Sequence, residues 1–247
     1  MKLVPNLSTR LHTHELMDES DADEERLRRT IGQFGVLNAL FSRSRFLMRR
    51  YFFSVMEAEP GRAWTLLDIG AGGCDLDRWF VTRARRKGIR VSVTAVDHDA
   101  RIVPWAREAC AAFPEITVLE GDALEIDRLG RFDFVFSNHT LHHLGDPDIE
   151  RVLELVSRSA ARAVVLNDLA RSIWAYIGYS IFTGLFVHRS FAFYDGRLSI
   201  RRGFAREELE AMASRVDSGA YSVVGVRPAR LAIVKTAKSL DAPTPSL

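Results

Sequence analysis

The chain has few cysteines and lacks long apolar runs. Cys74 and Cys110 are its only cysteines and form no C-x-x-C motif, which argues against a disulfide framework and suggests a reducing compartment. Both thiols are expected to be buried or half-buried. No run of about 18 apolar residues occurs, so no transmembrane helix is predicted. Met1 to Arg10 lacks a basic region followed by a long apolar core, so we expect no signal peptide and a cytoplasmic protein without stable membrane insertion.

The chain also lacks an excess of charge of one sign. Its 34 Lys and Arg residues are mixed with 32 Asp and Glu residues, for a net charge of +2. This balance gives no electrostatic footprint for nucleic acid, so we expect no nucleic-acid partner. With 247 residues, 47% of them hydrophobic, the chain is long enough for one α/β domain with a sizeable core.

What the chain does have is a glycine-rich stretch directly behind an apolar one. Residues 66–69 form a short apolar run, typical of a strand buried on both faces, and Asp68 stands near its end. The glycines that follow permit backbone angles that a Cβ would forbid; they are Gly70, Gly72 and Gly73. Apolar residues then recur at helical spacing, at Leu76, Trp79 and Phe80. The stretch therefore predicts a strand, a tight loop and a helix.

Two cofactor motifs compete for this loop. The dinucleotide fingerprint G-x-G-x-x-G fits Gly70 and Gly72, but Asp75 occupies its third glycine position. The loop instead resembles the D-x-G-x-G motif of class I S-adenosylmethionine (SAM) methyltransferases. A carboxylate here suits SAM, which carries an ammonium and a sulfonium, and it would repel a pyrophosphate. An ordinary glycine turn is the remaining alternative.

The next two predicted strands end in acidic residues. Residues 91–96 are mostly β-branched and apolar, and Asp97-His98 follows them. An acidic residue at this point can accept hydrogen bonds from both hydroxyls of a ribose, which SAM and NAD share. Residues 116–119 predict the third strand. Behind it, Gly121-Asp122-Ala123 resembles the G-D-A motif of the same methyltransferases, whose acidic side chain accepts from the adenine amino group.

The fourth and fifth predicted strands are followed by histidines and an aspartate. Residues 132–137 predict the fourth strand. Behind it, Asn138-His139-Thr140-Leu141-His142-His143-Leu144 resembles the S-N-x-x-L-H-H-L motif of many small-molecule methyltransferases. Residues 163–166 predict the fifth strand, which Asn167-Asp168 follows.

This ordered set of strand ends, over residues 64–168, resembles a class I SAM-dependent methyltransferase of the small-molecule, natural-product type. The resemblance implies an α/β fold with a seven-stranded, mostly parallel Rossmann-like sheet, an antiparallel last strand, N-terminal helices and a helical insertion after the fifth strand. It implies SAM as cofactor and S-adenosylhomocysteine as product, at the carboxyl ends of the strands. The cofactor-binding residues that it implies are Asp68, Gly70, Ala71, Gly72, Asp97, His98, Gly121, Asp122, Ala123 and Asn138.

We expect a single methyltransferase domain over residues 1–247, divided into five segments. Residues 1–60 form N-terminal helices that serve either as a lid or as packing on the sheet edge. Residues 61–169 form the SAM-binding core, and residues 170–204 an insertion. Residues 205–237 form a C-terminal helix and closing hairpin, and residues 238–247 a disordered Pro/Ser tail.

The insertion at residues 170–204 is the most aromatic and apolar stretch of the chain. A substrate-binding cap is the leading interpretation, because acceptor pockets are largely apolar. Core packing, a homodimer contact and a membrane-surface helix are the alternatives. Within the insertion, residues 193–196 predict a turn and residues 199–204 a polar loop.

The reaction that the resemblance implies is transfer of the SAM methyl group to a small aromatic or polyketide-like acceptor, on a hydroxyl oxygen. His142 is the implied general base, Asp168 its acidic partner, and His139 the reserve base. His139 and His143 stand four residues apart, but the sequence offers no third ligand, so no metal site is expected.

Three other functions compete with this hypothesis. C-methylation of a phenolic ring can use the same base. A NAD-dependent Rossmann oxidoreductase is the alternative of a different class, against which Asp75 and the Gly121-Asp122 pair argue. A non-catalytic SAM-binding protein is the third. Protein and nucleic-acid acceptors are disfavoured because N-P-P-Y is missing after the fourth strand, so a small-molecule acceptor is the expected partner.

Overall fold

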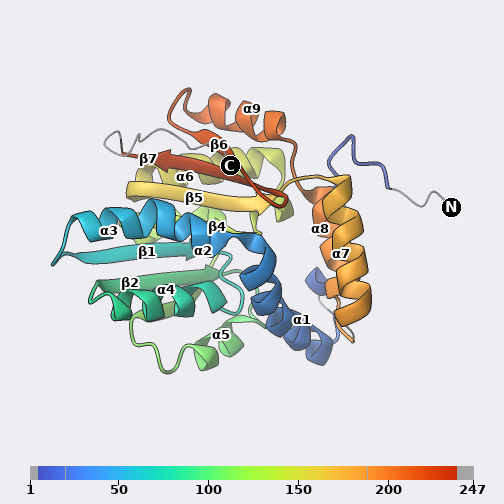
Figure 1. Ribbon diagram of the computed structural model, residues 1–247, viewed down its shortest axis with the longest axis horizontal. Helices are drawn as coiled ribbons and strands as arrows, with labels where there is room; N and C mark the ends of the chain where they lie inside the picture. The colour runs from blue at the N-terminus through green and yellow to red at the C-terminus, as the bar shows by residue number, and fades with distance from the viewer. Residues whose placement is uncertain (1–4, 20, 188, 238–247) are drawn as a thin grey trace.

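The protein is built around one seven-stranded sheet, seen in a computed structural model that describes residues 5–19, 21–187 and 189–237 (Figure 1). The strand order is β3-β2-β1-β4-β5-β7-β6. The strands are β1 (Ala63–Ile69), β2 (Arg90–Asp97), β3 (Ile116–Glu120), β4 (Phe132–Asn138), β5 (Ala160–Leu169), β6 (Ser222–Val226) and β7 (Arg230–Thr236). Neighbours among β1–β5 pair in parallel, and β7 runs antiparallel to β5 and β6. The predicted seven-stranded Rossmann-like fold is confirmed.

Helices cover both faces of the sheet and the carboxyl ends of its parallel strands. The α-helices are α1 (Glu24–Leu37), α2 (Ser44–Met48), α3 (Ser54–Ala58), α4 (Asp75–Arg86), α5 (Val103–Ala109), α6 (Asp146–Ser159), α7 (Ile173–Phe186), α8 (Ala192–Arg202) and α9 (Arg206–Val216). Shorter 3-10 or π-helical turns are η1 (Leu16–Asp18), η2 (Asn38–Ser42), η3 (Arg49–Phe53), η4 (Ala123–Leu129) and η5 (Leu141–His143). In Figure 1, α1, α7 and α8 lie together beyond the ends of the strands.

Two hydrophobic clusters fill the spaces on the two faces of the sheet. Successive residues of a strand point to opposite faces, so Leu66 belongs to one cluster and Leu67 to the other. The α4–α5 side also receives the aromatic residues of η3. There the Phe52 ring lies 4.8 Å from that of Phe134 and 6.5 Å from that of Phe80. Residues 44–58 therefore pack against the sheet.

The insertion differs from the prediction in one element. Residues 192–202 form helix α8, so the turn expected at 193–196 and the loop expected over most of 199–204 are wrong. Asp195 and Gly196 produced the turn signal, yet both have tertiary partners in the helix. Asp195 accepts hydrogen bonds from two backbone N–H groups of η1, and a Cβ on Gly196 would lie 2.0 Å from Tyr179 Oη. Close packing therefore explains the glycine better than a turn does.

The cysteines, the search for membrane-spanning helices and the C-terminal tail were also considered from the sequence. Both cysteines are buried free thiols. Among the described residues, no helix is long and apolar enough to cross a membrane. The predicted tail at 238–247 lies outside the described residues.

Phe52→Ala should destabilise the fold by about 3–5 kcal/mol, because it leaves a cavity between η3 and the sheet. Chemical denaturation measures the free energy of unfolding. Trp174→Ala is the matched control, since Trp174 is 79% exposed and its removal should change that free energy by no more than about 0.5 kcal/mol. Equal effects of the two substitutions would contradict the assigned core.

Candidate active site

The loop after β1 owes its shape to two glycines in the left-handed region. Gly70 has φ of 71° and Gly72 has φ of 53°. A Cβ on Gly70 would lie 2.2 Å from Thr140 Oγ1, so only glycine lets the loop after β4 approach this closely. Thr140 Oγ1 also donates to the carbonyl of Ile69, 3.1 Å away. The glycine loop and the loop that carries the histidines are therefore in direct contact.

The ends of β1, β2 and β3 meet at Asp97. Its Oδ2 accepts a 2.7 Å hydrogen bond from Gly72 N, and its backbone carbonyl accepts one of 2.9 Å from Gly121 N. Ala71 N donates to the carbonyl of Val96 at 3.0 Å. The structure thus brings Gly70, Ala71, Gly72, Asp97 and Gly121 to one place.

The remaining predicted cofactor residues lie around this centre. The His98 side chain is exposed beside Asp97. Asp122 is exposed too, and its Oδ1 accepts from Leu124 N at the start of η4, whose first residue is Ala123. The Asn138 amide is buried instead, in contact with Ser44 at the start of α2 and with Asn38 of η2.

Asn138 joins a buried polar network that ties these helices to the sheet. Its Oδ1 accepts from Ser44 Oγ at 2.8 Å and from Asn167 Nδ2 at 2.9 Å. Its Nδ2 donates to Asn38 Oδ1 at 3.2 Å. Because these bonds engage both the oxygen and the nitrogen of the amide, Asn138 fixes the chain near the cofactor loop in this structure.

Three carboxylates around the glycine loop have buried oxygens without a hydrogen-bond partner among the described residues. Asp68 Oδ1, Asp75 Oδ2 and both Oδ atoms of Asp77 are buried without a hydrogen-bond partner among the described residues. Burial, together with the charge of Asp77, raises the pKa of Asp68 well above its usual range. Burial also raises the pKa of Asp77 to about 6. Such a cluster is stabilised by a positively charged ligand, so the donor set fits the ammonium and sulfonium of SAM.

His142 and Asp168 form a buried pair at the ends of the neighbouring strands β4 and β5. His142 Nδ1 lies 2.7 Å from Asp168 Oδ1, and the His142 backbone N donates to Asp168 Oδ2 at 3.1 Å. Burial alone would lower the pKa of His142, but Asp168 and Glu15 outweigh burial and raise this pKa to about 9. The same pairing holds the pKa of Asp168 below its usual range, against its burial. The carboxylate fixes the ring with Nδ1 as donor, which leaves Nε2 for chemistry.

His139 has a different environment. It has φ of 64° and lies half-buried against Arg230, whose Nη1 contacts His139 Nε2. Burial and the charge of Arg230 hold the pKa of His139 well below its usual range. Because the guanidinium donates to this ring nitrogen, the lone pair that a base needs is already engaged. The structure brings His142 and Asp168 together and leaves His139 in a separate pair.

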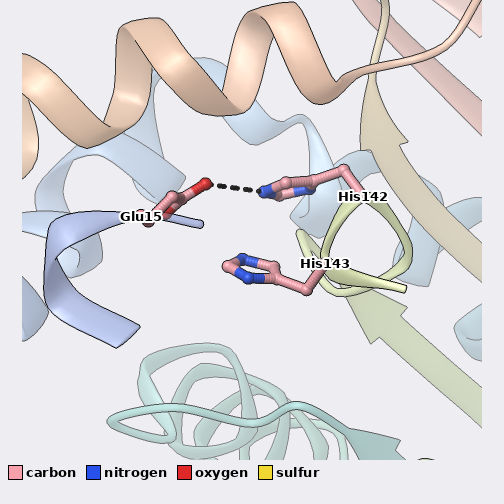
Figure 2. Close-up of side chains that lie close together, drawn as sticks. All are labelled: Glu15, His142 and His143. Carbon is pink, nitrogen blue, oxygen red and sulfur yellow. Dashed lines mark ion pairs between the residues drawn. The ribbon is translucent and has the colours of Figure 1, made fainter. Parts of the chain in front are cut away.

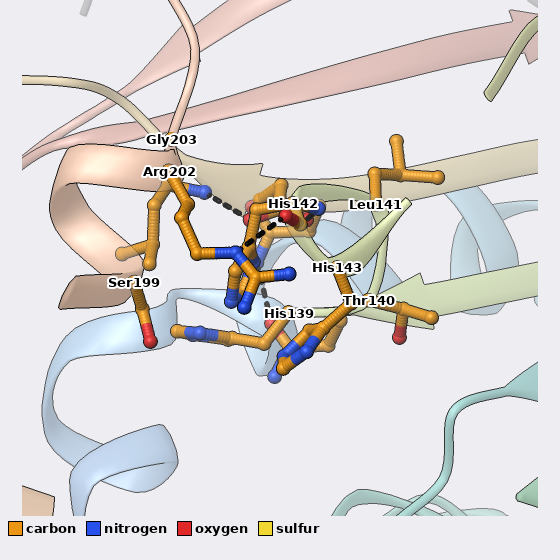
Figure 3. Close-up of polar contacts among 12 residues, drawn as sticks. His139, Thr140, Leu141, His142, His143, Ser199, Arg202 and Gly203 are labelled. Atoms are coloured by element: carbon orange, nitrogen blue, oxygen red, sulfur yellow. Dashed lines mark hydrogen bonds and ion pairs between the residues drawn. The ribbon is translucent and has the colours of Figure 1, made fainter. Parts of the chain in front are cut away.

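Glu15 is a site residue that the sequence did not reveal. Figure 2 shows it facing His142 from the N-terminal segment, with Oε1 3.6 Å from His142 Nε2. Ser199 Oγ donates to the same oxygen at 2.6 Å, and Arg202 Nη1 lies 3.7 Å from it. Figure 3 shows Arg202 extending from α8 to the histidine loop, where its Nε donates to the His142 carbonyl at 3.0 Å. Glu15 stands in a polar stretch without periodicity, so no sequence signal marked it.

Glu15 also belongs to a group of three potential metal ligands, which contains His142 and not the His139 considered from the sequence. Ligand atoms of Glu15, His142 and His143 lie within 4.8 Å of one another. Two imidazoles and a carboxylate are a donor set that divalent transition metals take. His143 Nδ1 also lies 3.4 Å from Asp18 Oδ2, and the Arg202 guanidinium adds a positive charge beside Glu15.

Comparison with known proteins now assigns the class. Residues 66–162 match the family model described as a methyltransferase domain. No curated protein matches the chain. Among solved structures, human N-acetylserotonin methyltransferase in complex with SAM is 14% identical with a TM-score of 0.60, over 87% of this chain and 56% of that one. The plantazolicin methyltransferase BamL is 15% identical with a TM-score of 0.54, over 89% and 88% of the two chains.

A third similar structure is the CurJ carbon methyltransferase, 20% identical with a TM-score of 0.53 over 75% of this chain. The chain spans about half the length of that protein and of the human enzyme, at 51% and 56%. The strand order is that of the class I, Rossmann-like methyltransferase fold, and the matched domain spans β1 to the start of β5. Residues 66–162 therefore contain a methyltransferase domain, and SAM is the cofactor that this domain implies.

Asp97→Ala should weaken SAM binding by about 1.5–3 kcal/mol, the scale for losing hydrogen bonds to a charged group. The substitution also removes the bond that holds Gly72 N. Titration calorimetry measures the affinity, with Asp127→Ala, an exposed aspartate beyond β3, as the control. Unchanged SAM affinity in Asp97→Ala would mean that the ribose site lies elsewhere.

The stability of the protein should fall as pH rises from about 6.5 to about 9. The folded state keeps the proton on His142 up to about pH 9, whereas an unfolded histidine releases it near 6.5, so raising the pH favours unfolding. The raised pKa corresponds to roughly 3 kcal/mol. Urea unfolding of wild type and His142→Asn at several pH values measures this difference. A stability difference independent of pH in this range would contradict the charged pair.

Proposed function

We propose that this enzyme methylates a hydroxyl of a small aromatic or polyketide-like acceptor, with His142 as general base and Asp168 as its partner. The observation that carries the proposal is the 2.7 Å contact between His142 Nδ1 and Asp168 Oδ1, at the end of β4. This pair lies on the loop that contacts the glycine loop through Thr140. The base therefore stands next to the predicted cofactor site.

The contribution of the chain follows from this geometry. Bound SAM supplies a methyl group that its sulfonium already activates, and S-adenosylhomocysteine is the product. The chain has to align the acceptor, which can contribute roughly 7–11 kcal/mol, and to remove its proton, which contributes about 10²–10⁴-fold in rate. His142 Nε2 accepts the hydroxyl proton, while Asp168 orients the ring and stabilises the imidazolium that forms.

The acceptor class rests on the insertion beside this pair. α7 carries no charged residue, and with α8 it lies beyond the strand ends (Figure 1). Tyr176 and Ile200 form an apolar cluster there with Leu169 at the end of β5. Apolar, aromatic surroundings suit a ring-bearing acceptor. Two structures of the same fold are named as methyltransferases of N-acetylserotonin and of plantazolicin, which supports this proposal.

C-methylation of a phenolic ring is the second candidate. The CurJ carbon methyltransferase shares the fold. Removing the proton of a phenol also raises electron density on the adjacent ring carbon, so His142 would serve either outcome. Product analysis by mass spectrometry and NMR separates an ether from a C-methyl compound.

His142→Ala should lower kcat at least about 100-fold at saturating SAM and acceptor, with SAM affinity unchanged, as loss of a general base requires. Methyl-labelled SAM and a panel of small phenols provide the assay. His139→Ala is the comparison, and its kcat should fall far less because Arg230 already engages that ring. A loss confined to His139→Ala would move the base to His139, and full activity in both variants would exclude a histidine base.

A further inference from the structure

The N-terminal segment forms a strap, residues 10–19, across the candidate base. Arg10 fastens one end, since its Nη2 donates to the Leu144 carbonyl at 2.6 Å. Arg101 fastens the other end through the Met17 carbonyl at 2.9 Å. Asp195 of α8 holds the middle by accepting from two backbone N–H groups of η1. The strap thus has a defined position, with Glu15 at its centre.

Glu15 blocks access to Nε2, the ring nitrogen of His142 that does not contact Asp168. His142 Nε2 has no hydrogen-bond partner within the described part of the chain, and the nearest carboxylate oxygen is Glu15 Oε1 at 3.6 Å. Both side chains are only 2% exposed. An acceptor hydroxyl within hydrogen-bond distance of Nε2 would occupy the space that Glu15 fills, so the two cannot be there together.

The charges around His142 come from every element packed against it. The groups are Asp168 of β5, Glu15 and Asp18 of the strap, His139 and His143 of its own loop, Arg202 of α8, Arg230 of β7, and Arg10. The pKa of Glu15 lies below its usual range despite burial, because His142, His143 and Ser199 stabilise its charge. His142 therefore stands between two ionised carboxylates. This arrangement favours the imidazolium, which has no lone pair with which to accept a proton.

We propose that Glu15 is a positioning residue that occupies the acceptor's place at His142 Nε2, and that the strap withdraws it when the acceptor binds. This inference rests on the proposed function of His142. Withdrawal separates one of the two carboxylates from the ring, so the Nε2 proton is released to solvent and the lone pair becomes available. Binding of the acceptor and activation of the base are then one event, and the base stays silent while the acceptor is absent.

The full-length protein tests this without an acceptor. NMR of protein labelled with 13C in the histidine rings, titrated with pH, gives the ionisation midpoint of His142, which His142→Ala assigns. Glu15→Gln keeps the shape of the side chain and removes its charge. We expect its His142 midpoint to fall by at least about one pH unit, the scale for loss of one close opposite charge. Glu19→Gln makes the same change at an exposed position of the strap and should leave the midpoint unchanged.

An unchanged midpoint in folded Glu15→Gln would overturn the proposal. If Glu15→Gln does not fold, Arg101→Ala loosens the strap from outside the site, and its His142 midpoint should also fall. A wild-type midpoint that persists in Arg101→Ala would again count against the strap. Zinc retained stoichiometrically after dialysis against Zn²⁺, and lost in Glu15→Gln, would replace the proposal with a metal site of Glu15, His142 and His143.

Turnover gives a second readout that a merely structural residue would not change. The lower-pH limb of the profile of kcat/KM should move to lower pH in Glu15→Gln, because this limb reports the base of the free enzyme. A uniform loss at every pH would indicate a folding role only and would overturn the proposal. Failure of the proposed function is distinct, because it appears as full activity of His142→Ala whatever the NMR titration shows.

Discussion

The pairing of β1 with β4 at the centre of the sheet is the constraint on which the site depends. This pairing places Ile69 beside Ser137, and the Ile69 carbonyl accepts hydrogen bonds from Ser137 Oγ at 2.9 Å and Thr140 Oγ1 at 3.1 Å. Because β2 lies on the other side of β1, the strand order reverses here, which is where ligands bind in open α/β sheets. One carbonyl thus links the loop of the cofactor to the loop of the base.

The two halves of the site differ in how their buried charge is balanced. Around the glycine loop, Asp68 and Asp77 face each other with carboxylate oxygens that no described group satisfies. Around the base, His142 lies between Asp168 and Glu15. Ser199 Oγ also donates a hydrogen bond to Glu15. Burial raises the pKa of Asp68 and Asp77, and a cation bound beside them would favour their charged forms. At the base, by contrast, each carboxylate already has a partner. This difference agrees with a cationic cofactor on one side and a neutral acceptor on the other.

The sequence predicted the strands and their polar ends because local rules govern them. A strand buried on both faces must be apolar, so Asp68, Asp97 and Asp168 stand out where each such run ends. Helix α8 was missed because local turn signals at Asp195 and Gly196 are overridden by partners in the strap and α7. Glu15 was missed for a different reason, since no local pattern marks it and only the folded chain shows that it lies against His142.

The segment before β1 has a larger part in the site than its distance along the chain suggests. Asn38 donates to Asp75, the first residue of α4, at 3.3 Å and accepts from Asn138 at 3.2 Å. It therefore contacts both the glycine loop side and the histidine loop side of the site. Glu15 of the same segment faces the base. The parallel sheet leaves its carboxyl edge open, and the chain covers that edge with an element whose polar contacts are made mostly with site residues. Residues 44–58 of this segment belong to the apolar core, whereas residues 10–19 are held by the hydrogen bonds of Arg10, Asp195 and Arg101 and by a small apolar cluster around Met17. The position of residues 10–19 therefore responds to what the site binds more than the core does.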